Sequence, residues 1–313
     1  MEDRPAISLL GIPLDLGAGD RGSAMGPAAL RIAGIPELLG DLGYHVADHG
    51  DVARPDPVPV ELPGDAAARC RHLPEIAAWT RAIHDRAHEV IGQGGKPIFL
   101  GGDHSMAMGT ISAVSRHCAD SGKKLAVLWI DAHADYNTPA TSLSGNMHGM
   151  PLAFLTGEPS LRPLLGDRPF VTLAPEKLVL LGLRSIDQLE RKALRDAHIQ
   201  CVDMGMIDKF GVSNMIEQVL YRIGGKNVHL HVSLDVDALD PSVAPGVGTT
   251  VPGGLTYREA HLMLESLHES GLVGSLDIVE LNPFLDTRGM SARVLAELTG
   301  SLFGQTILGT NPL

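Results

Sequence analysis

The segment KLAVLWIDAHAD, residues 124–135, places a continuous apolar run directly before an alternating series of acids and one histidine. Its first ten residues predict a buried strand, because an unbroken apolar run indicates that both faces of the strand are covered. Similar runs, rich in Val, Ile and Leu, occur at residues 7–12, 96–102, 177–185, 227–237 and 274–282. Such strands are typical of a parallel sheet between two layers of helices.

Helical periodicity alternates with these runs, at residues 26–42, 75–93, 105–119, 186–197, 212–223, 257–270 and 290–306. Two weaker strand candidates, 44–50 and 199–204, bring the expected number of strands to about eight. The alternation predicts an α/β fold, a three-layer α/β/α arrangement with a central, mostly parallel sheet. It continues across the proline-rich residues 54–65 and across 158–177, so we expect one catalytic domain spanning residues 1–313.

Composition restricts the class of protein to which the chain could belong. The net charge of −12 disfavours nucleic acid or an anionic membrane as a partner, since either requires a basic face. No apolar run is long enough to span a bilayer, and residues 1–15 lack the basic start and long apolar core of a signal peptide. The cysteines are few and widely spaced, which predicts a cytoplasmic location and no disulfide framework: Cys70, Cys118 and Cys201.

Residues suited to catalysis or metal binding follow the ends of four predicted strands. In open parallel sheets the ligand crevice forms at the carboxyl ends of the strands, so side chains far apart in sequence converge there. The expected group consists of His104, Asp131, His133, Asp135, Asp235, Asp237 and Glu280. In DAHAD (131–135) and DVD (235–237) the ligands alternate with small residues, and continued strand geometry would direct them to one side.

Charge sets the expected number of metal ions. Four aspartates clustered near a buried sheet end would be costly without partners, and two divalent cations balance their four negative charges. Carboxylates and imidazoles without a thiolate favour manganese over zinc. Two such ions about 3.5–4 Å apart would lower the pKa of a bridging water and produce a hydroxide nucleophile near neutral pH.

Each motif alone also has an ordinary structural interpretation. A DxD sequence often forms a turn or a cap, and Asp103 in GGDH could cap the helix that follows. Acids and a histidine at alternate positions after a buried strand, however, have no packing role. The ordinary interpretation would require every cluster to fall at a strand end by chance, so a metal site is the preferred interpretation.

The motifs, in their order along the chain, resemble those of the ureohydrolase family and, within it, the arginases. The similarity covers nearly the whole chain, in GIPLDLGAGDRGSAMGPAALR (11–31), GGDHS (101–105), DAHADYNTPATSLSGNMHG (131–149), GLRSIDQLE (182–190), SLDVDALDP (233–241), GTTVPGGLTYRE (248–259) and SLDIVELNP (275–283). DAHAD and SLDVDALDP are signatures of the whole family. The loop NTPATSLSGNMHG (137–149) is a narrower signature, because agmatinases and formiminoglutamases differ there.

The resemblance implies a dimanganese hydrolase that converts L-arginine to L-ornithine and urea through attack by a metal-bridging hydroxide. The residues that match the ligands of one ion are His104, Asp131, Asp135 and Asp235. Those that match the ligands of the other are His133, Asp131, Asp235 and Asp237. Asp131 and Asp235 would therefore bridge the two ions.

The resemblance also implies catalytic and substrate-binding roles. Asp135 would hydrogen-bond the hydroxide and pass a proton to the leaving amine, Glu280 would pair with the guanidinium, and His148 would shuttle protons. Donors to the substrate carboxylate would be Asn137, Ser142, Ser144 and Asn146. Acceptors from the α-ammonium would be Asp187 and Glu190, and the hydroxyl near the guanidinium would belong to Thr249.

Ordinary alternatives stay open for several of these residues. Asn137 and Ser144 could be turn residues, and Asp187 and Glu190 could be first-turn acids of a helix. For Glu280, within an apolar strand, no easy structural alternative is available.

Three departures from the arginase pattern, Tyr136, Ser185 and the residues around Thr249, leave the fine specificity open. The alternative function is that of another ureohydrolase, such as an agmatinase or a guanidinobutyrase. A metal-dependent deacetylase would need a histidine pair or a tyrosine beside the metal, which we do not find in the sequence. A non-catalytic metal-binding protein would release no urea.

Assembly is predicted by the resemblance alone. Members of the family are commonly trimers or hexamers, so we expect a homo-oligomer. The segment ILGTNPL (307–313) is short and lacks the C-terminal extension of the animal enzymes, which favours an assembly of the bacterial kind.

Overall fold

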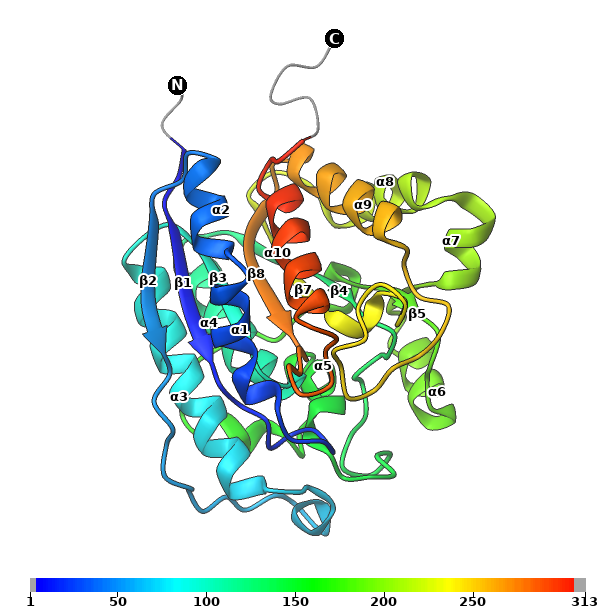
Figure 1. Cartoon of the computed structure of the whole chain (residues 1–313). Helices are drawn as coiled ribbons and strands as arrows, with labels where there is room; N and C mark the ends of the chain where they lie inside the picture. The colour runs from blue at the N-terminus through cyan, green and yellow to red at the C-terminus, as the bar shows by residue number, and fades with distance from the viewer. Residues whose placement is uncertain (1–3, 307–313) are drawn as a thin grey trace.

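The computed structural model describes residues 4–306 and contains one eight-stranded sheet, in which every pair of neighbouring strands is parallel (Figure 1). The order of strands across the sheet is β2-β1-β3-β8-β7-β4-β5-β6. The strands are β1 (Ile7–Ile12), β2 (Val46–Asp51), β3 (Lys96–Gly101), β4 (Lys124–Ile130), β5 (Leu178–Leu183), β6 (Gln200–Asp203), β7 (Val228–Asp235) and β8 (Val273–Val279). The predicted α/β fold with a parallel sheet is therefore confirmed.

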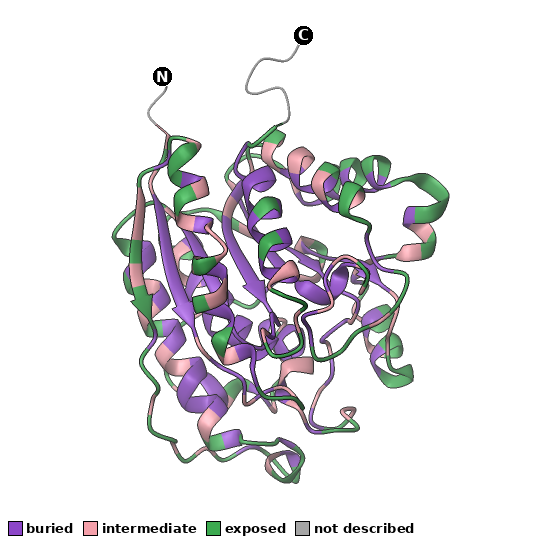
Figure 2. Cartoon of the chain, in the orientation of Figure 1, coloured by how far each residue is buried: buried purple, intermediate pink, exposed green. Residues whose placement is uncertain are grey.

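Helices cover both faces of this sheet (Figure 1). They are α1 (Gly26–Ile32), α2 (Ile35–Asp41), α3 (Leu73–Gly92), α4 (Ala107–Asp120), α5 (Pro151–Leu155), α6 (Gln188–Asp196), α7 (Met204–Phe210), α8 (Val212–Ile223), α9 (Tyr257–Glu269) and α10 (Met290–Leu302). On β4, Leu128 and Ile130 pack in the core with α1, α2 and α7–α10, whereas Val127 and Trp129 pack with α3–α6. The strands with continuous apolar runs, such as β1 and β5, are therefore buried on both faces, which explains those runs, whereas the edge strand β2 is half-buried or exposed (Figure 2).

Some predicted boundaries are wrong. The helix expected at 26–42 is two helices, because Gly34 adopts a φ of 95° between α1 and α2. The helix expected to reach residue 306 ends at Leu302, and α7 was not expected as a separate helix. The segment 307–313, on which the assembly prediction partly rests, lies outside the described residues. Within residues 4–306, no helix is long and apolar enough to cross a membrane.

The expectation that strand geometry continues through DAHAD and DVD is also wrong. Strand β4 ends at Ile130, and Asp135 has a φ of 47°, in the left-handed region. After β7, Val236–Ala238 forms a 3-10 turn. An extended strand would separate alternate ligands by about 7 Å. The turned backbone instead brings them to one point.

Candidate metal centre and active site

The strand order places the predicted ligands side by side. His104 follows β3, Asp131 follows β4, Asp235 ends β7 and Glu280 follows β8. These four strands are neighbours in the sheet, in the order β3-β8-β7-β4. Their carboxyl ends therefore form one continuous edge, as expected for a ligand site in a parallel sheet.

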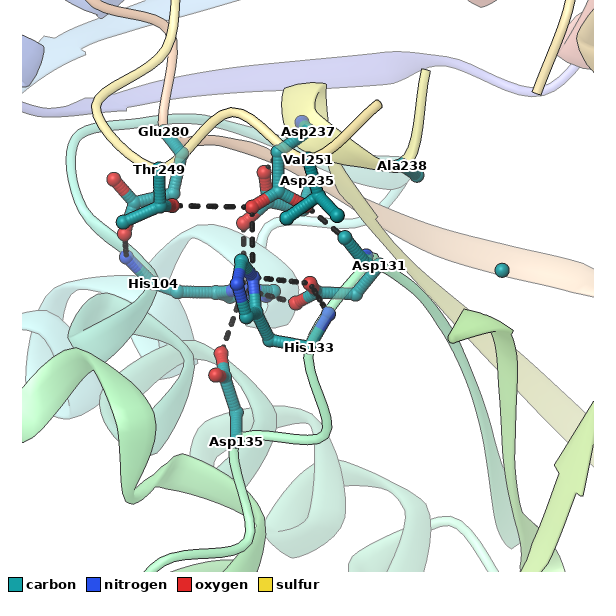
Figure 3. A network of polar contacts seen from close by, with 12 residues as sticks. His104, Asp131, His133, Asp135, Asp235, Asp237, Ala238, Thr249, Val251 and Glu280 are labelled. Atoms are coloured by element: carbon teal, nitrogen blue, oxygen red, sulfur yellow. Dashed lines mark hydrogen bonds and ion pairs between the residues drawn. The ribbon is translucent and has the colours of Figure 1, made fainter. Parts of the chain in front are cut away.

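One ligand group surrounds the imidazole of His104 (Figure 3). Its Nδ1 lies 3.1 Å from a carboxylate oxygen of each of Asp131, Asp135 and Asp235. This nitrogen is buried and makes no hydrogen bond of good geometry among the described residues. A buried nitrogen that faces three carboxylates in this way is an arrangement that a metal ion would satisfy.

A second ligand group contains His133 and Asp237 and shares Asp131 with the first (Figure 3). His133 Nδ1 lies 2.9 Å from Asp237 Oδ2 and 3.6 Å from Asp131 Oδ1. The hydroxyl of Thr249 donates to the same Asp237 oxygen at 3.2 Å. The structure thus brings together all six predicted ligands, while a bridging role for Asp235 stays a prediction.

The electrostatics of these groups favour a cationic partner. Burial, together with the charges of Asp237 and Asp131, raises the pKa of Asp235 well above its usual range. Burial lowers the pKa of His133, but its bonds to Asp131 and Asp237 outweigh this and raise the pKa to about 12. Without metal, the cluster thus holds protons to limit its negative charge. Four carboxylates and two imidazoles fit two divalent cations in charge and in donor type.

Two residues that hold the ligands in place were missed by the sequence reasoning. Trp129 stacks on His104 with ring centroids 3.8 Å apart and donates from Nε1 to Asp131 Oδ2 at 3.0 Å. Ser233 Oγ lies 2.8 Å from His104 Nε2. Trp129 and Ser233 pair in register across β4 and β7, each two residues before an aspartate ligand. The two-residue period of a strand was the signal that could have found them.

Glu280 and His148 lie together beside the first ligand group. Oε1 of Glu280 accepts hydrogen bonds from His148 Nδ1 at 2.9 Å and from the backbone NH of His104 at 2.8 Å. Burial lowers the pKa of His148, but the charge of Glu280 outweighs this and raises it to about 9. Like Asp135, Glu280 has a positive φ, of 64°. Such backbone strain in residues other than glycine often accompanies functional sites.

One cavity of about 270 Å³ joins the ligand groups to the predicted substrate residues. The predicted substrate-binding residues all line it: Asn137, Ser142, Ser144, Asn146, Asp187, Glu190 and Thr249. Its lining also includes Leu143, Gly149 and Ser185, to which the sequence reasoning gave no substrate role. Leu143 was missed because an exposed apolar residue in a polar loop carries no pattern of its own.

Several polar residues of the cavity also stabilise their own loops. Ser142 Oγ accepts from the NH of Gly145 at 3.0 Å, and Ser144 Oγ accepts from the NH of Asn146 at 3.1 Å. These bonds are typical of turn residues, so the structural alternative holds for Ser144, for which it was stated. Ser142 makes a bond of the same kind, and both serines also line the cavity.

Asp187 and Glu190 differ in their availability to a ligand. Glu190 is buried, its Oε2 accepts from the NH of Asp187 at 3.3 Å, and its Oε1 accepts from the NH of Tyr136 at 2.8 Å. Burial raises the pKa of this carboxyl to about 7. Asp187 is exposed, and its Oδ2 lies 3.4 Å from Asn137 Nδ2. Glu190 is thus a first-turn acid of α6, as the structural alternative predicts, and it also connects α6 to the ligand loop.

Comparisons with known proteins identify relatives of this chain. Residues 5–304 match the model of the Arginase family. The arginase of Brucella melitensis is 44% identical over 300 residues, which cover 96% of each chain. The structure of the arginase from Bacillus caldovelox superposes with a TM-score of 0.88 at 42% identity, over 97% of this chain and 100% of that one. An arginase from Entamoeba histolytica, in complex with L-ornithine, superposes with a TM-score of 0.83 at 29% identity, over 96% and 99% of the chains. The chain, a hydrolase by these relatives, therefore belongs to the arginase family.

Proposed function

We propose that this chain hydrolyses the guanidinium group of L-arginine to L-ornithine and urea with two manganese ions, as one catalytic domain. The observation that carries the proposal is a single cavity, lined by members of both ligand groups, by Glu280 and by residues of the loop 137–149. When bound, two divalent cations activate a water molecule for attack on the guanidinium carbon. The residues that would hold them are His104, Asp131, His133, Asp135, Asp235 and Asp237.

Glu280 would orient the guanidinium. Its Oε1 already accepts two hydrogen bonds, from His104 and His148. Among the residues described, none donates to Oε2, and Glu280 lines the cavity. We infer that the substrate N–H groups donate to Oε2, which holds the guanidinium carbon toward the ligand groups. The hydroxyl of Thr249 lines the same part of the cavity.

The protons of the reaction would pass through two residues. Asp135 faces the first ligand group and lines the cavity, so its carboxylate can carry a proton from the attacking water to the leaving amine. His148 has Nδ1 fixed by Glu280, which leaves Nε2 to exchange a proton with solvent.

The amino-acid end of the substrate would lie against loop 137–149 and α6. Asn137, Ser142, Ser144 and Asn146 supply neutral donors for a carboxylate, and Asp187 supplies an acceptor for an ammonium group. Both oxygens of Glu190 already accept backbone hydrogen bonds, so we infer that Glu190 contributes less than Asp187 to binding the α-ammonium group. The complex of the Entamoeba histolytica arginase with L-ornithine supports this class of ligand.

The experiment that tests the proposal is a urea-release assay with manganese, paired with metal analysis, across arginine, agmatine and guanidinobutyrate. Agmatine lacks the carboxylate that the loop donors would bind, so kcat/KM should be highest for arginine. A value for agmatine equal to or above that for arginine would reject the arginase function and favour another ureohydrolase. A cytoplasmic location and a homo-oligomeric assembly, trimer or hexamer, stay predictions.

A further inference from the structure

Arg184 lies directly after β5, and among residues 4–306 its guanidinium bonds only to backbone carbonyls. It donates to Asp237 O at 2.5 Å, to Val251 O at 2.7 and 3.1 Å, and to the carbonyls of Gly182, Leu239 and Ala238 at 3.2–3.4 Å. Within residues 4–306 it forms no ion pair with a carboxylate. A half-buried cation bonded in this way fixes backbone rather than neutralising an acid.

The carbonyls that Arg184 binds belong to the segments that build the second ligand group. Residues 237–239 carry the carboxylate of Asp237, and the segment with Val251 also carries Thr249, which donates to Asp237 Oδ2. The backbone NH groups of Arg184 and Ser185 both donate to Ala132 O, at 2.9 and 3.0 Å. Ala132 lies between the ligands Asp131 and His133. Arg184 thus connects every segment of this ligand group.

The chain makes room for this contact at a glycine. A Cβ added to Gly254 would lie 2.6 Å from Arg184 Nη2 and 2.6 Å from the backbone of Leu239. A larger residue would therefore push the guanidinium away from its carbonyls. Lysine could not replace the arginine, because a single ammonium cannot reach carbonyls on several segments as a planar guanidinium with five donors does.

Burial lowers the pKa of Arg184, while the nearby charges of Asp237, Asp131, Asp240 and Asp235 raise it. A guanidinium stays protonated in proteins, so its charge is fixed. None of these carboxylate oxygens accepts a hydrogen bond from the guanidinium of Arg184, so the carboxylates of both ligand groups stay available to cations.

We propose that Arg184 is a positioning residue for the second metal ion: by holding the backbone of Asp237, Val251 and Ala132 together, it preforms the His133–Asp237 half of the site. Loss of the guanidinium would then weaken binding of the second divalent ion and leave the His104 group unaffected. The inference rests on the proposed function only in requiring a divalent metal at these residues.

The test is a titration of the metal-free chain with Mn²⁺, followed by the electron paramagnetic resonance signal of free Mn²⁺, for the wild type, Arg184→Ala and Arg184→Lys. We expect the dissociation constant of one of the two ions to rise about 10- to 100-fold in both variants, as for other residues that orient ligands, and that of the other ion to change less than about threefold. Circular dichroism and the melting temperature report on folding separately. Should Arg184→Ala not fold, Arg184→Lys alone decides the outcome.

Arg31→Ala is the matched control. Arg31 is also half-buried and donates to Asp48, Asp51 and Gly50 O, but at β2 on the edge of the sheet. Its loss should lower stability without changing either dissociation constant.

Three results would overturn the inference: equal changes of both constants, no change of either, or full recovery in Arg184→Lys. A wild type that binds fewer than two manganese ions would do the same. A wild type that binds two ions but releases no urea from arginine would reject the proposed function and leave the inference about Arg184 intact.

Discussion

The half-buried imidazole of His148 and the buried carboxylate of Glu280 form a pair, with Nδ1 of the histidine 2.9 Å from Oε1 of the glutamate. The same oxygen accepts the backbone NH of His104, whose side chain faces three aspartates. The proposed proton shuttle, the proposed guanidinium anchor and the first ligand group are thereby fixed relative to one another. Substitution of Glu280 should consequently affect chemistry without removing a ligand.

Glu280→Gln should lower kcat/KM for arginine by about 100-fold or more, because charged hydrogen bonds to the guanidinium and to His148 are lost. Steady-state urea release at saturating manganese measures this change. Metal content should stay at the wild-type value, which serves as the internal control. A kcat/KM within about threefold of wild type would contradict the anchor role.

Asp131→Asn should lose more metal than Asp237→Asn, because Asp131 belongs to both ligand groups and Asp237 to one. We expect Asp237→Asn to retain about one metal ion per chain. Asp131→Asn should retain little of either ion, because each ion needs all the residues of its ligand group. Elemental analysis after gel filtration compares the two. Equal metal content in both variants would show that Asp131 does not bridge.

Asp187→Ala should lower kcat/KM for arginine by about tenfold, since a charged hydrogen bond to the α-ammonium is lost. The change should be small for 5-guanidinopentanoate, which is arginine without the α-amino group. Asp196→Ala, at the last residue of α6, is the control, because Asp196 is exposed and pairs with Lys192 at 2.7 Å. Equal losses on both substrates in Asp187→Ala would remove the α-ammonium role from this residue.

A buried histidine away from the site should contribute to acid sensitivity. Burial lowers the pKa of His84 to about 4, so between the ordinary value of 6.5 and about 4 the unfolded chain takes up a proton that the folded chain refuses. Stability is therefore unaffected by this group above pH 6.5 and decreases as the pH falls below it. Each pH unit in this window corresponds to about 1.4 kcal/mol.

In wild type, His84 should lower the free energy of unfolding by about 2 kcal/mol between a pH near 7.5 and a pH near 5, and His84→Gln should remove this decrease. Urea denaturation of the metal-free chain at both pH values, compared with wild type, measures the difference. The same dependence in variant and wild type would show that the imidazole is accessible to protons in the folded chain.

Local pattern was sufficient for the elements and for the ligand types. Six of the eight strands were found from their apolar runs and two as weaker candidates, and the ligands were found from their positions at strand ends: His104, Asp131, His133, Asp135, Asp235 and Asp237. These are properties of neighbouring residues, because strand burial and strand ends are encoded over a few positions. Bounds that depend on one residue, such as the break at Gly34, were less well determined.

The sequence by itself therefore determined the parallel sheet, its apolar strands and the residues able to bind metal. Only the tertiary structure decided that β3, β8, β7 and β4 are neighbours, which brings the NH of His104 to Glu280, 176 residues away. It also revealed Trp129 stacked on His104, Glu190 held by backbone donors, and Arg184 bonded to carbonyls. These contacts depend on how the crossovers order the strands, and that order is set by long-range packing rather than by any local pattern.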